Sequence, residues 1–395
     1  MESLHPAVLA WLLLAGPLWS AIGTWGIPRV YREKGLDTSQ AGTAGALAGF
    51  VAGPFLLAPL WRLAPELSRG WNLVAAVLAA GELYVLFALL FPKNLCVTNA
   101  SYVLNQISSG LTIGFIYALM AVGLTLIYSV QGIVSFAHGQ FYMIGGYVSY
   151  FLLQRVTDLN PIIGVPVAGA ITLLIGMAFE RGFLRPMHLG RVERAAEYAI
   201  LITFGFGFFL EYTALALVGP FSQKTAPYLN ARSFVLGPLR LLPNRLVAAA
   251  VGIALIGALL YLIRSTWTGK GLRAVSMDKQ AAAVIGVDPL RMNTLAFGIG
   301  TMLAGMSGAA LIPIFTWVPW VGTTAAVRSF VIIVLGGLGS IPGALIGGII
   351  IGLVQALGAG CYPDPSKGAA YKEAFGLIIF VLVLLWRPTG LFGRE

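Results

Sequence analysis

The chain is poor in charge for its length. Its 25 Lys and Arg and 15 Asp and Glu make up 10% of 395 residues, whereas a soluble domain carries about 25%. So few charges cannot form the water-facing surface of a soluble protein of this size. Hydrophobic residues make up 58% of the chain, with 49 glycines besides. The composition therefore predicts an all-α, polytopic membrane protein.

Cysteine and histidine are scarce as well. Two cysteines are too few to hold a chain of this length together by disulfide bonds. The three histidines, His5, His138 and His188, are too dispersed for a zinc motif such as HExxH. We therefore expect no metal site and no metal-dependent proteolysis.

A phosphate-binding loop is missing. The nearest string, 264–271, lacks the leading glycine and has Gly271 where Ser or Thr must reach magnesium. We expect no enzymatic activity and no cofactor of this chain's own, so that any nucleotide energy must come from another chain. The net charge of +10 is spread over short loops, as is usual in membrane proteins, and does not indicate nucleic-acid binding.

Apolar runs divide the chain into membrane spans of about 20 residues each. Ten runs are long enough, or nearly so: 7–27, 43–60, 71–91, 107–128, 132–153, 162–179, 198–218, 246–263, 292–313 and 374–386. The first three would form an N-terminal extension over 1–100, ahead of a second membrane domain over 101–395. The loops 181–194 and 264–291 collect Lys and Arg and should face the cytoplasm, although 219–245 carries four more cations.

The stretch between Arg328 and Asp364 is uncharged and too long for one straight span. As a single helix its 35 residues would extend about 52 Å, against a hydrocarbon layer of about 30 Å. We predict two short helices around a broken or re-entrant hairpin, which brings the total number of membrane spans to ten to twelve. The residues of this turn are Gly336, Gly337, Gly339, Pro342 and Gly343.

Glycines spaced four residues apart predict close helix packing. They occur at 45, 49 and 53, at 110 and 114, at 343 and 347, and at 348 and 352. Such faces let helix backbones approach closely in lipid.

Several polar residues interrupt the apolar segments. Ser135, His138 and Gln140 form one group, and Glu211 lies alone inside another span. Polar groups at membrane depth must face the bundle interior or water. Each could line a translocation path, or His138 could pack against a backbone carbonyl and Glu211 could make a structural hydrogen bond.

The loop 264–291 contains a predicted short helix over 276–286. Ser276 could cap its start, alanines favour its middle, and Gly286 ends it before Pro289. Such a helix on the cytoplasmic side could dock into a groove of another protein.

Five segments together resemble the LivH-type permeases of branched-chain amino-acid ABC importers. The first segment, 110–128, contains the strings GLT, YAL and GLTLIY, and the second, 136–143, contains FAHG and YM. The third, 271–287, contains GLRA, Asp278, AA and GV. The last two are GGLGSIPG at 336–343 and PTGLFG at 388–393. The resemblance extends from residue 102 to the C-terminus and leaves the N-terminal extension without a counterpart.

The resemblance implies a coupling segment to the ATPase. Gln280, Ala281, Ala282 and Gly286 have the EAAxxxG spacing of ABC importer permeases, with Gln where Glu is usual. The coupling residues it implies are Arg273, Asp278, Gln280, Ala281, Ala282 and Gly286.

The resemblance also implies a function. The chain would be a permease subunit that carries branched-chain or other small neutral amino acids across the bacterial inner membrane. Its partners would be a LivM-type second permease, two ATPases that bind the ATP, and an extracytoplasmic solute-binding protein, all in or at the lipid bilayer. The alternatives are a stand-alone channel or proton-coupled carrier, or an ABC permease for urea or amides.

Overall fold

The computed structural model describes residues 87–88, 91–155, 160–229, 233–237 and 239–393. Contacts divide the chain into two units, 1–99 and 100–395. The predicted spans 7–27 and 43–60, and most of 71–91, lie outside the described residues. The described part of the first unit includes the short helix α5 (Leu95–Thr98), which the side chain of Asn94 caps.

The second unit is helical, as predicted. Six helices or helical stretches are long and apolar enough to cross a membrane: 100–131, 161–188, 195–218, 243–265, 289–311 and 341–360. The protein is therefore a multi-pass membrane protein. A short antiparallel pair, β1 (Phe234–Leu236) and β2 (Leu239–Leu241), is the exception to the all-α class.

The helices of the second unit run from α6 to α18 along the chain. They are α6 (Ala100–Gln131), α7 (His138–Arg155), α8 (Pro161–Phe179), the π-helix η2 (Glu180–Leu184), α9 (Arg185–His188), α10 (Ala195–Val218), α11 (Pro243–Ser265), α12 (Trp267–Met277), α13 (Lys279–Val284), α14 (Pro289–Leu311), α15 (Val321–Gly336), α16 (Ile341–Gly360), α17 (Pro365–Gly368) and α18 (Lys372–Trp386).

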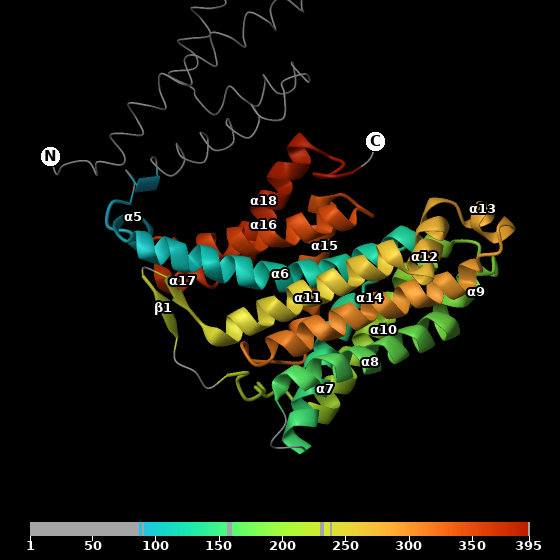
Figure 1. Ribbon diagram of the computed structural model, residues 1–395, viewed down its shortest axis with the longest axis horizontal. Helices are drawn as coiled ribbons and strands as arrows, with labels where there is room; N and C mark the ends of the chain where they lie inside the picture. The colour runs from blue at the N-terminus through green and yellow to red at the C-terminus, as the bar shows by residue number, and fades with distance from the viewer. Residues whose placement is uncertain (1–86, 89–90, 156–159, 230–232, 238, 394–395) are drawn as a thin grey trace, which may run out of the picture. The chain divides into compact units, whose positions relative to one another are not determined.

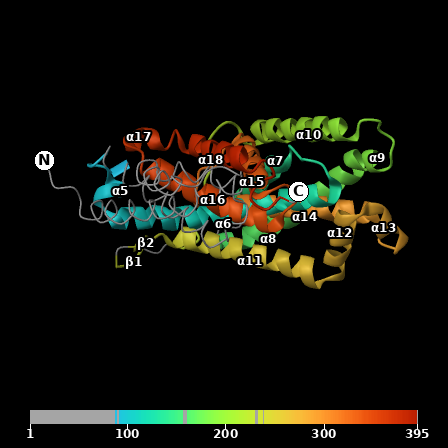
Figure 2. The same ribbon diagram turned by 90° about the horizontal axis from the view of Figure 1, so that it is seen from above.

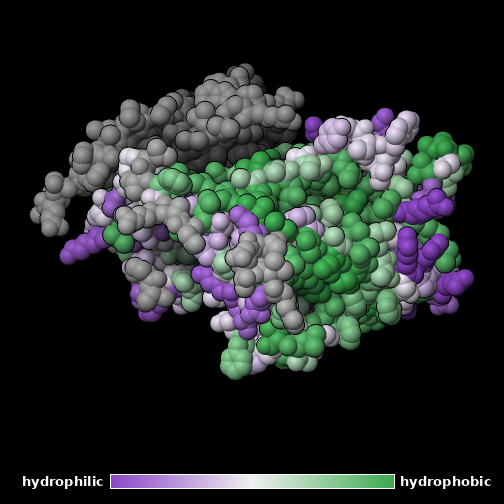
Figure 3. All heavy atoms as spheres, turned by 60° about the horizontal axis from the view of Figure 1, so that its bottom comes forward, coloured by the Kyte–Doolittle hydropathy of each residue, from purple (hydrophilic) through white to green (hydrophobic). Residues whose placement is uncertain are grey.

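The long helices lie side by side. Figures 1 and 2 place α9, α12 and α13 at one end of this bundle and β1 and α17 at the other. We call these the α13 end and the hairpin end. Hydrophobic side chains cover much of the face in Figure 3, and strongly hydrophilic ones gather both at the α13 end and on the hairpin side. This distribution fits a bundle whose middle lies in lipid.

Helix α6 is the centre of the bundle. From Ile116 to Ile127 its side chains are buried, and they pack against α11, α14, α15 and α16. On α16, a Cβ added to Gly352 would lie 2.5 Å from the Cα of Gly114 and 2.6 Å from the carbonyl oxygen of Gly110. The two backbones are thus in contact, as glycine spacing allows.

The predicted span 132–153 is wrong in its first six residues. Residues 132–137 are not helical, and α7 begins only at His138. The His138 side chain meets the carbonyl of Met120, eleven residues before the end of α6, or about 16 Å along that helix. The chain therefore returns into the bundle as irregular backbone, which is tolerated at this depth because protein surrounds it.

The predicted turn between two helices spans Gly337 to Ser340. Gly337 has a φ of 99°, which favours glycine, and Ser340 caps α16 by accepting a hydrogen bond from Gly343 N. The C-terminal segment packs on this turn: Leu391 N donates to Leu335 O and Phe392 N to Gly336 O, both at 2.9 Å.

Candidate functional site

The loop 264–291 forms two helices rather than one. Helix α12 continues through Ser276 to Met277, and α13 begins after Asp278. Asp278, and not Ser276, caps α13: its Oδ1 accepts hydrogen bonds from Gln280 N at 2.8 Å and Ala281 N at 3.1 Å. The aspartate is the better cap here because it lies in extended backbone at the break between the helices.

The two faces of α13 differ. Ala282 is only 2% exposed and belongs to the buried core of this chain. Val284 and Ile285 are 87% and 74% exposed, and Met277 is as exposed as Val284. The other predicted coupling residues are exposed as well: Arg273, Gln280, Ala281 and Gly286. Large apolar side chains are thus exposed at the α13 end of the bundle, where hydrophilic side chains also gather.

Lys279 joins α13 to the bundle. Its Nζ donates a hydrogen bond to Gln131 O at the end of α6, at 3.0 Å. Gln131 Nε2 in turn donates to Asn293 O in α14, at 2.9 Å. Partial burial lowers the pKa of Lys279. The position of α13 is therefore tied to α6 and α14 together.

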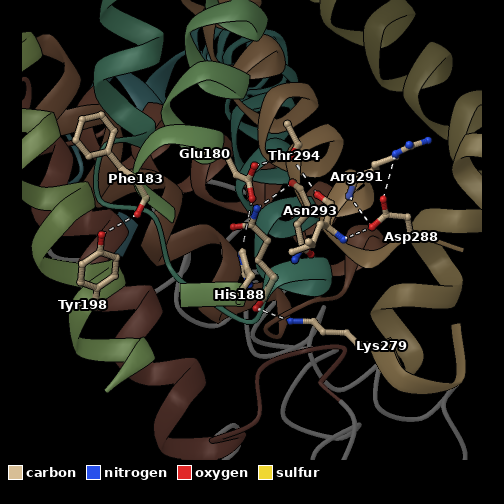
Figure 4. Close-up of polar contacts among 11 residues, drawn as sticks. Glu180, Phe183, His188, Tyr198, Lys279, Asp288, Arg291, Asn293 and Thr294 are labelled. Carbon is tan, nitrogen blue, oxygen red and sulfur yellow. Dashed lines mark hydrogen bonds and ion pairs between the residues drawn. The ribbon is translucent and has the colours of Figure 1, made fainter. Parts of the chain in front are cut away.

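A second polar group lies beside this connection (Figure 4). Glu180 is fully buried in the π-helix and accepts a hydrogen bond from Thr294 Oγ1 in α14, at 2.5 Å. Its other carboxylate oxygen lies 3.9 Å from His188 Nε2. Sequence reasoning did not single out Glu180. A π-helix interrupting an α-helix often marks a functional position.

Two of the predicted path residues meet within the bundle. Gln140 Nε2 in α7 donates hydrogen bonds to Glu211 Oε2 in α10, at 2.8 Å, and to Thr323 Oγ1 in α15, at 3.2 Å. Thr323 Oγ1 also donates to Glu211 Oε2, at 2.7 Å. We call Gln140, Glu211 and Thr323 the polar triad. Thr323 was missed, because the pair Thr323-Thr324 at the start of an apolar run carries no signal of its own.

The other two predicted path residues lie apart from the triad. His138 is fully buried, and its Nε2 lies 3.0 Å from the Met120 carbonyl oxygen. This geometry favours the packing role that the sequence left open. Ser135 is also fully buried, in the irregular segment before α7, and its hydroxyl has no partner among the described residues.

A third polar group joins α15 to α18. Arg328 Nε donates to Glu373 Oε1 at 2.9 Å and to Oε2 at 3.0 Å, and its Nη1 donates to Tyr117 Oη at 3.0 Å. Gln355 Nε2 donates to Glu373 Oε2 at 3.1 Å. The sequence did not single out this pair: Arg328 only bounds the uncharged stretch that ends at Asp364, and Glu373 directly follows Lys372.

No group of three His, Cys, Asp or Glu side chains in the described ranges could hold a metal ion. What the geometry offers instead is polar groups within apolar helices, together with an apolar contact surface at one hydrophilic end. Polar groups within membrane-spanning helices commonly mark substrate or ion pathways, so the fold and these groups fit the class of polytopic transport proteins.

The comparison with known families narrows this class. Residues 106–384 match the family described as the permease component of branched-chain amino acid transport systems. The chain belongs to this family.

Curated relatives support the assignment. BraD of Pseudomonas aeruginosa, a high-affinity branched-chain amino acid transport system permease protein, is 32% identical over 305 residues, 74% of this chain and 96% of BraD. LivH of Escherichia coli K12 is 31% identical over 306 residues, with the same coverage. LivM of the same strain is 26% identical over 306 residues, 71% of this chain and 68% of LivM. No solved structure matches.

Proposed function

We propose that this chain is one of two permease subunits of an ABC importer in the bacterial inner membrane. It carries branched-chain or other small neutral amino acids inward. Its partners are a LivM-type permease, two cytoplasmic ATPases that bind the ATP, and an external solute-binding protein. Family membership and the similarity to BraD and LivH support this proposal.

The observation that carries the proposal is the exposed apolar surface of α13. Val284, the last residue of α13, and Ile285, which follows it, are 87% and 74% exposed at the α13 end. Isolated apolar side chains on a surface are ordinary, but adjacent large ones beside a capped helix mark a contact site. A groove on an ATPase subunit is the partner that the proposed importer supplies, and the α13 end is then cytoplasmic.

The connection from α13 into the bundle gives the mechanism. Ala282 packs into the core, and Lys279 is bonded to the end of α6. When the ATPases close, they pull α13, and α6 and α14 move with it. Because the ATPase surface would contact α13 differently in its two states, the outward-open and inward-open forms differ in free energy.

The amino acid passes beside the polar triad. Glu211 and Thr323 belong to different helices, α10 and α15, and Thr323 is exposed at the surface of this chain. Ionisable groups within membrane spans commonly mark substrate pathways. The partner permease would cover this surface and complete the path.

The test is the double variant Val284→Asp/Ile285→Asp in proteoliposomes that contain the whole transporter and its binding protein. We expect ATP-dependent L-leucine uptake to fall at least tenfold, because two carboxylates replace the apolar contact. Val284→Leu is the matched control and should retain uptake. Ala282→Arg is a poorer test, since Ala282 is buried in this chain.

Two outcomes would contradict the proposal. One is unchanged uptake by the double variant. The other is wild-type uptake that ignores ATP depletion and collapses with a protonophore, which would identify a secondary carrier.

A further inference from the structure

The ion pair between Arg328 and Glu373 is unusual for its place in the bundle. Arg328 lies in the middle of α15 and Glu373 in the first turn of α18. Their side chains are 19% and 41% exposed. A charge within a membrane span is costly and is retained mainly where it serves a path or site.

The hydrogen bonds of this pair leave groups without partners. Arg328 has five N–H donors, and one N–H on each Nη has no acceptor among the described residues. Gln355 Nε2 donates to the Glu373 carboxylate, which fixes the orientation of the amide. Gln355 Oε1 is therefore an acceptor; it is buried without a partner in the described part of the chain, in a side chain that is 1% exposed.

These groups match the two ends of a zwitterion. The unused N–H groups of Arg328 can receive a carboxylate, as guanidinium groups commonly do. Gln355 Oε1 and the Glu373 carboxylate can receive an ammonium group. A phosphate or a simple anion would satisfy Arg328 alone and would be repelled by Glu373.

Two cavities lie beside this group: the pair itself lines one, and its hydrogen-bond partners Tyr117 and Gln355 line the other. One, of about 250 Å³, is lined by Tyr117, Arg245 and Gln355 among others. The other, of about 230 Å³, is lined by Thr323, Arg328, Gln355 and Glu373 among others. Gln355 borders both. Drug-sized ligands fill cavities of about 300–1,000 Å³, so these suit a smaller molecule.

The cavities extend in both directions. The first adjoins a third cavity, of about 240 Å³, toward the hairpin end, with which it shares Gln106, Ser109 and Arg245. The second reaches Thr323 of the polar triad. The Arg328–Glu373 pair thus lies between an outer hollow and the triad within the bundle.

We propose that Arg328, Glu373 and Gln355 form a binding site for the charged α-carboxylate and α-ammonium groups of the transported amino acid. This site rests on the proposed function and adds to it a position at which this chain itself recognises the substrate. The amino acid enters from the outer cavities, exchanges hydrogen bonds with the ion pair, and passes on toward Thr323.

The experiment is the double variant Arg328→Met/Glu373→Leu, which replaces the pair by apolar side chains. Such replacements of buried pairs are often neutral or stabilising. In the reconstituted transporter with its binding protein, we expect L-leucine uptake to fall at least tenfold. ATP hydrolysis stimulated by the loaded binding protein should stay within twofold of wild type, because the α13 end is intact.

The possible outcomes distinguish a substrate-binding role of the Arg328–Glu373 pair from a purely structural one. Uptake within twofold of wild type would overturn the proposal, since the pair would then only hold α15 to α18. Loss of uptake together with loss of stimulated hydrolysis would also overturn it. The surface pair at the hairpin end gives the control: Asp364→Asn/Lys367→Gln should leave both readouts unchanged. Uptake by the wild-type transporter is measured first. If the wild-type transporter takes up no L-leucine, that result counts against the proposed function and not against this site.

A second measurement does not depend on the folding of any variant. The unfolding temperature of the wild-type membrane complex, without binding protein, is measured with L-leucine, with leucinamide, which lacks the carboxylate, and with 4-methylpentanoate, which lacks the amine. Only L-leucine should raise it. An equal rise with 4-methylpentanoate would indicate a simple anion site, and no rise with L-leucine would contradict the proposal.

Discussion

Two contacts between helices use opposite chemistry. Between α6 and α16, glycines bring the backbones together, and no side chain separates them. Between α15 and α18, a charged pair joins the helices; it lines one cavity, and its hydrogen-bond partners Tyr117 and Gln355 line another. We call these the glycine contact and the charged contact.

The difference indicates which contact can change during transport. Closely packed backbones have one good arrangement, because any shift causes overlap. A charged pair with spare hydrogen-bonding groups can exchange partners with a ligand or with water. We therefore expect the glycine contact to act as a fixed frame and the charged contact to change its hydrogen bonds.

The largest expected effect comes from breaking the charged contact on one side only. Arg328→Met leaves the Glu373 carboxylate without its cation. Removing one partner of a fully buried pair costs about 3–5 kcal/mol; because the Glu373 side chain is 41% exposed, we expect the lower end of this range. We expect a correspondingly lower free energy of unfolding, measured by denaturation in detergent. The double variant Arg328→Met/Glu373→Leu should recover most of this loss. If the single variant is as stable as the double one, the pair is solvated and the contrast between the contacts fails.

A smaller loss in the free energy of unfolding is expected when the glycine contact is disturbed. A Cβ at position 348 would lie 2.5 Å from the backbone N and Cα of Ala118. Gly348→Val should therefore cost about 1–3 kcal/mol through overpacking, with uptake reduced only as far as the amount of folded protein falls. Gly205→Ala is the control, because a Cβ at Gly205 meets nothing within 4 Å; it should be neutral or stabilising by up to about 1 kcal/mol. Equal losses at both positions would contradict the close packing of α6 on α16.

The glycine contact could be predicted from the sequence, and the charged contact could not. Regular spacing along a single helix reveals a face, so the steps at 110 and 114 and at 348 and 352 indicated close packing. Arg328 and Glu373 are far apart in sequence, and no local pattern shows that two isolated charges meet. The same reason explains why Thr323 was missed while Gln140 and Glu211 were found.

Local backbone chemistry explains the errors at element boundaries. A largely apolar run such as 132–153 is compatible both with a helix and with buried irregular chain, and the polar residues Ser135 and His138 within it did not show that α7 begins only at His138. Ser276 and Asp278 are both good caps, and the choice between them depends on how α12 packs, which only the fold determines. Ala282 was expected on the docking surface, but the spacing of small residues does not tell which face of a short helix is buried.

The smallest changes offer the sharpest comparison, because the same substitution can be made at both contacts. Tyr102 Oη donates to Gly360 O at 3.2 Å beside the glycine contact, and Tyr117 Oη accepts from Arg328 at the charged contact. Each Tyr→Phe change removes an interhelical hydrogen bond that is typically worth about 0.6 kcal/mol, so both variants should unfold at nearly the same denaturant concentration. Their uptake should differ, because Tyr117→Phe frees a donor of Arg328 and alters its hydrogen bonding to the substrate, whereas Tyr102→Phe touches no part of the proposed site. We expect a several-fold fall in L-leucine uptake for Tyr117→Phe and none for Tyr102→Phe; identical uptake in the two variants would mean that the charged contact is as passive as the glycine contact.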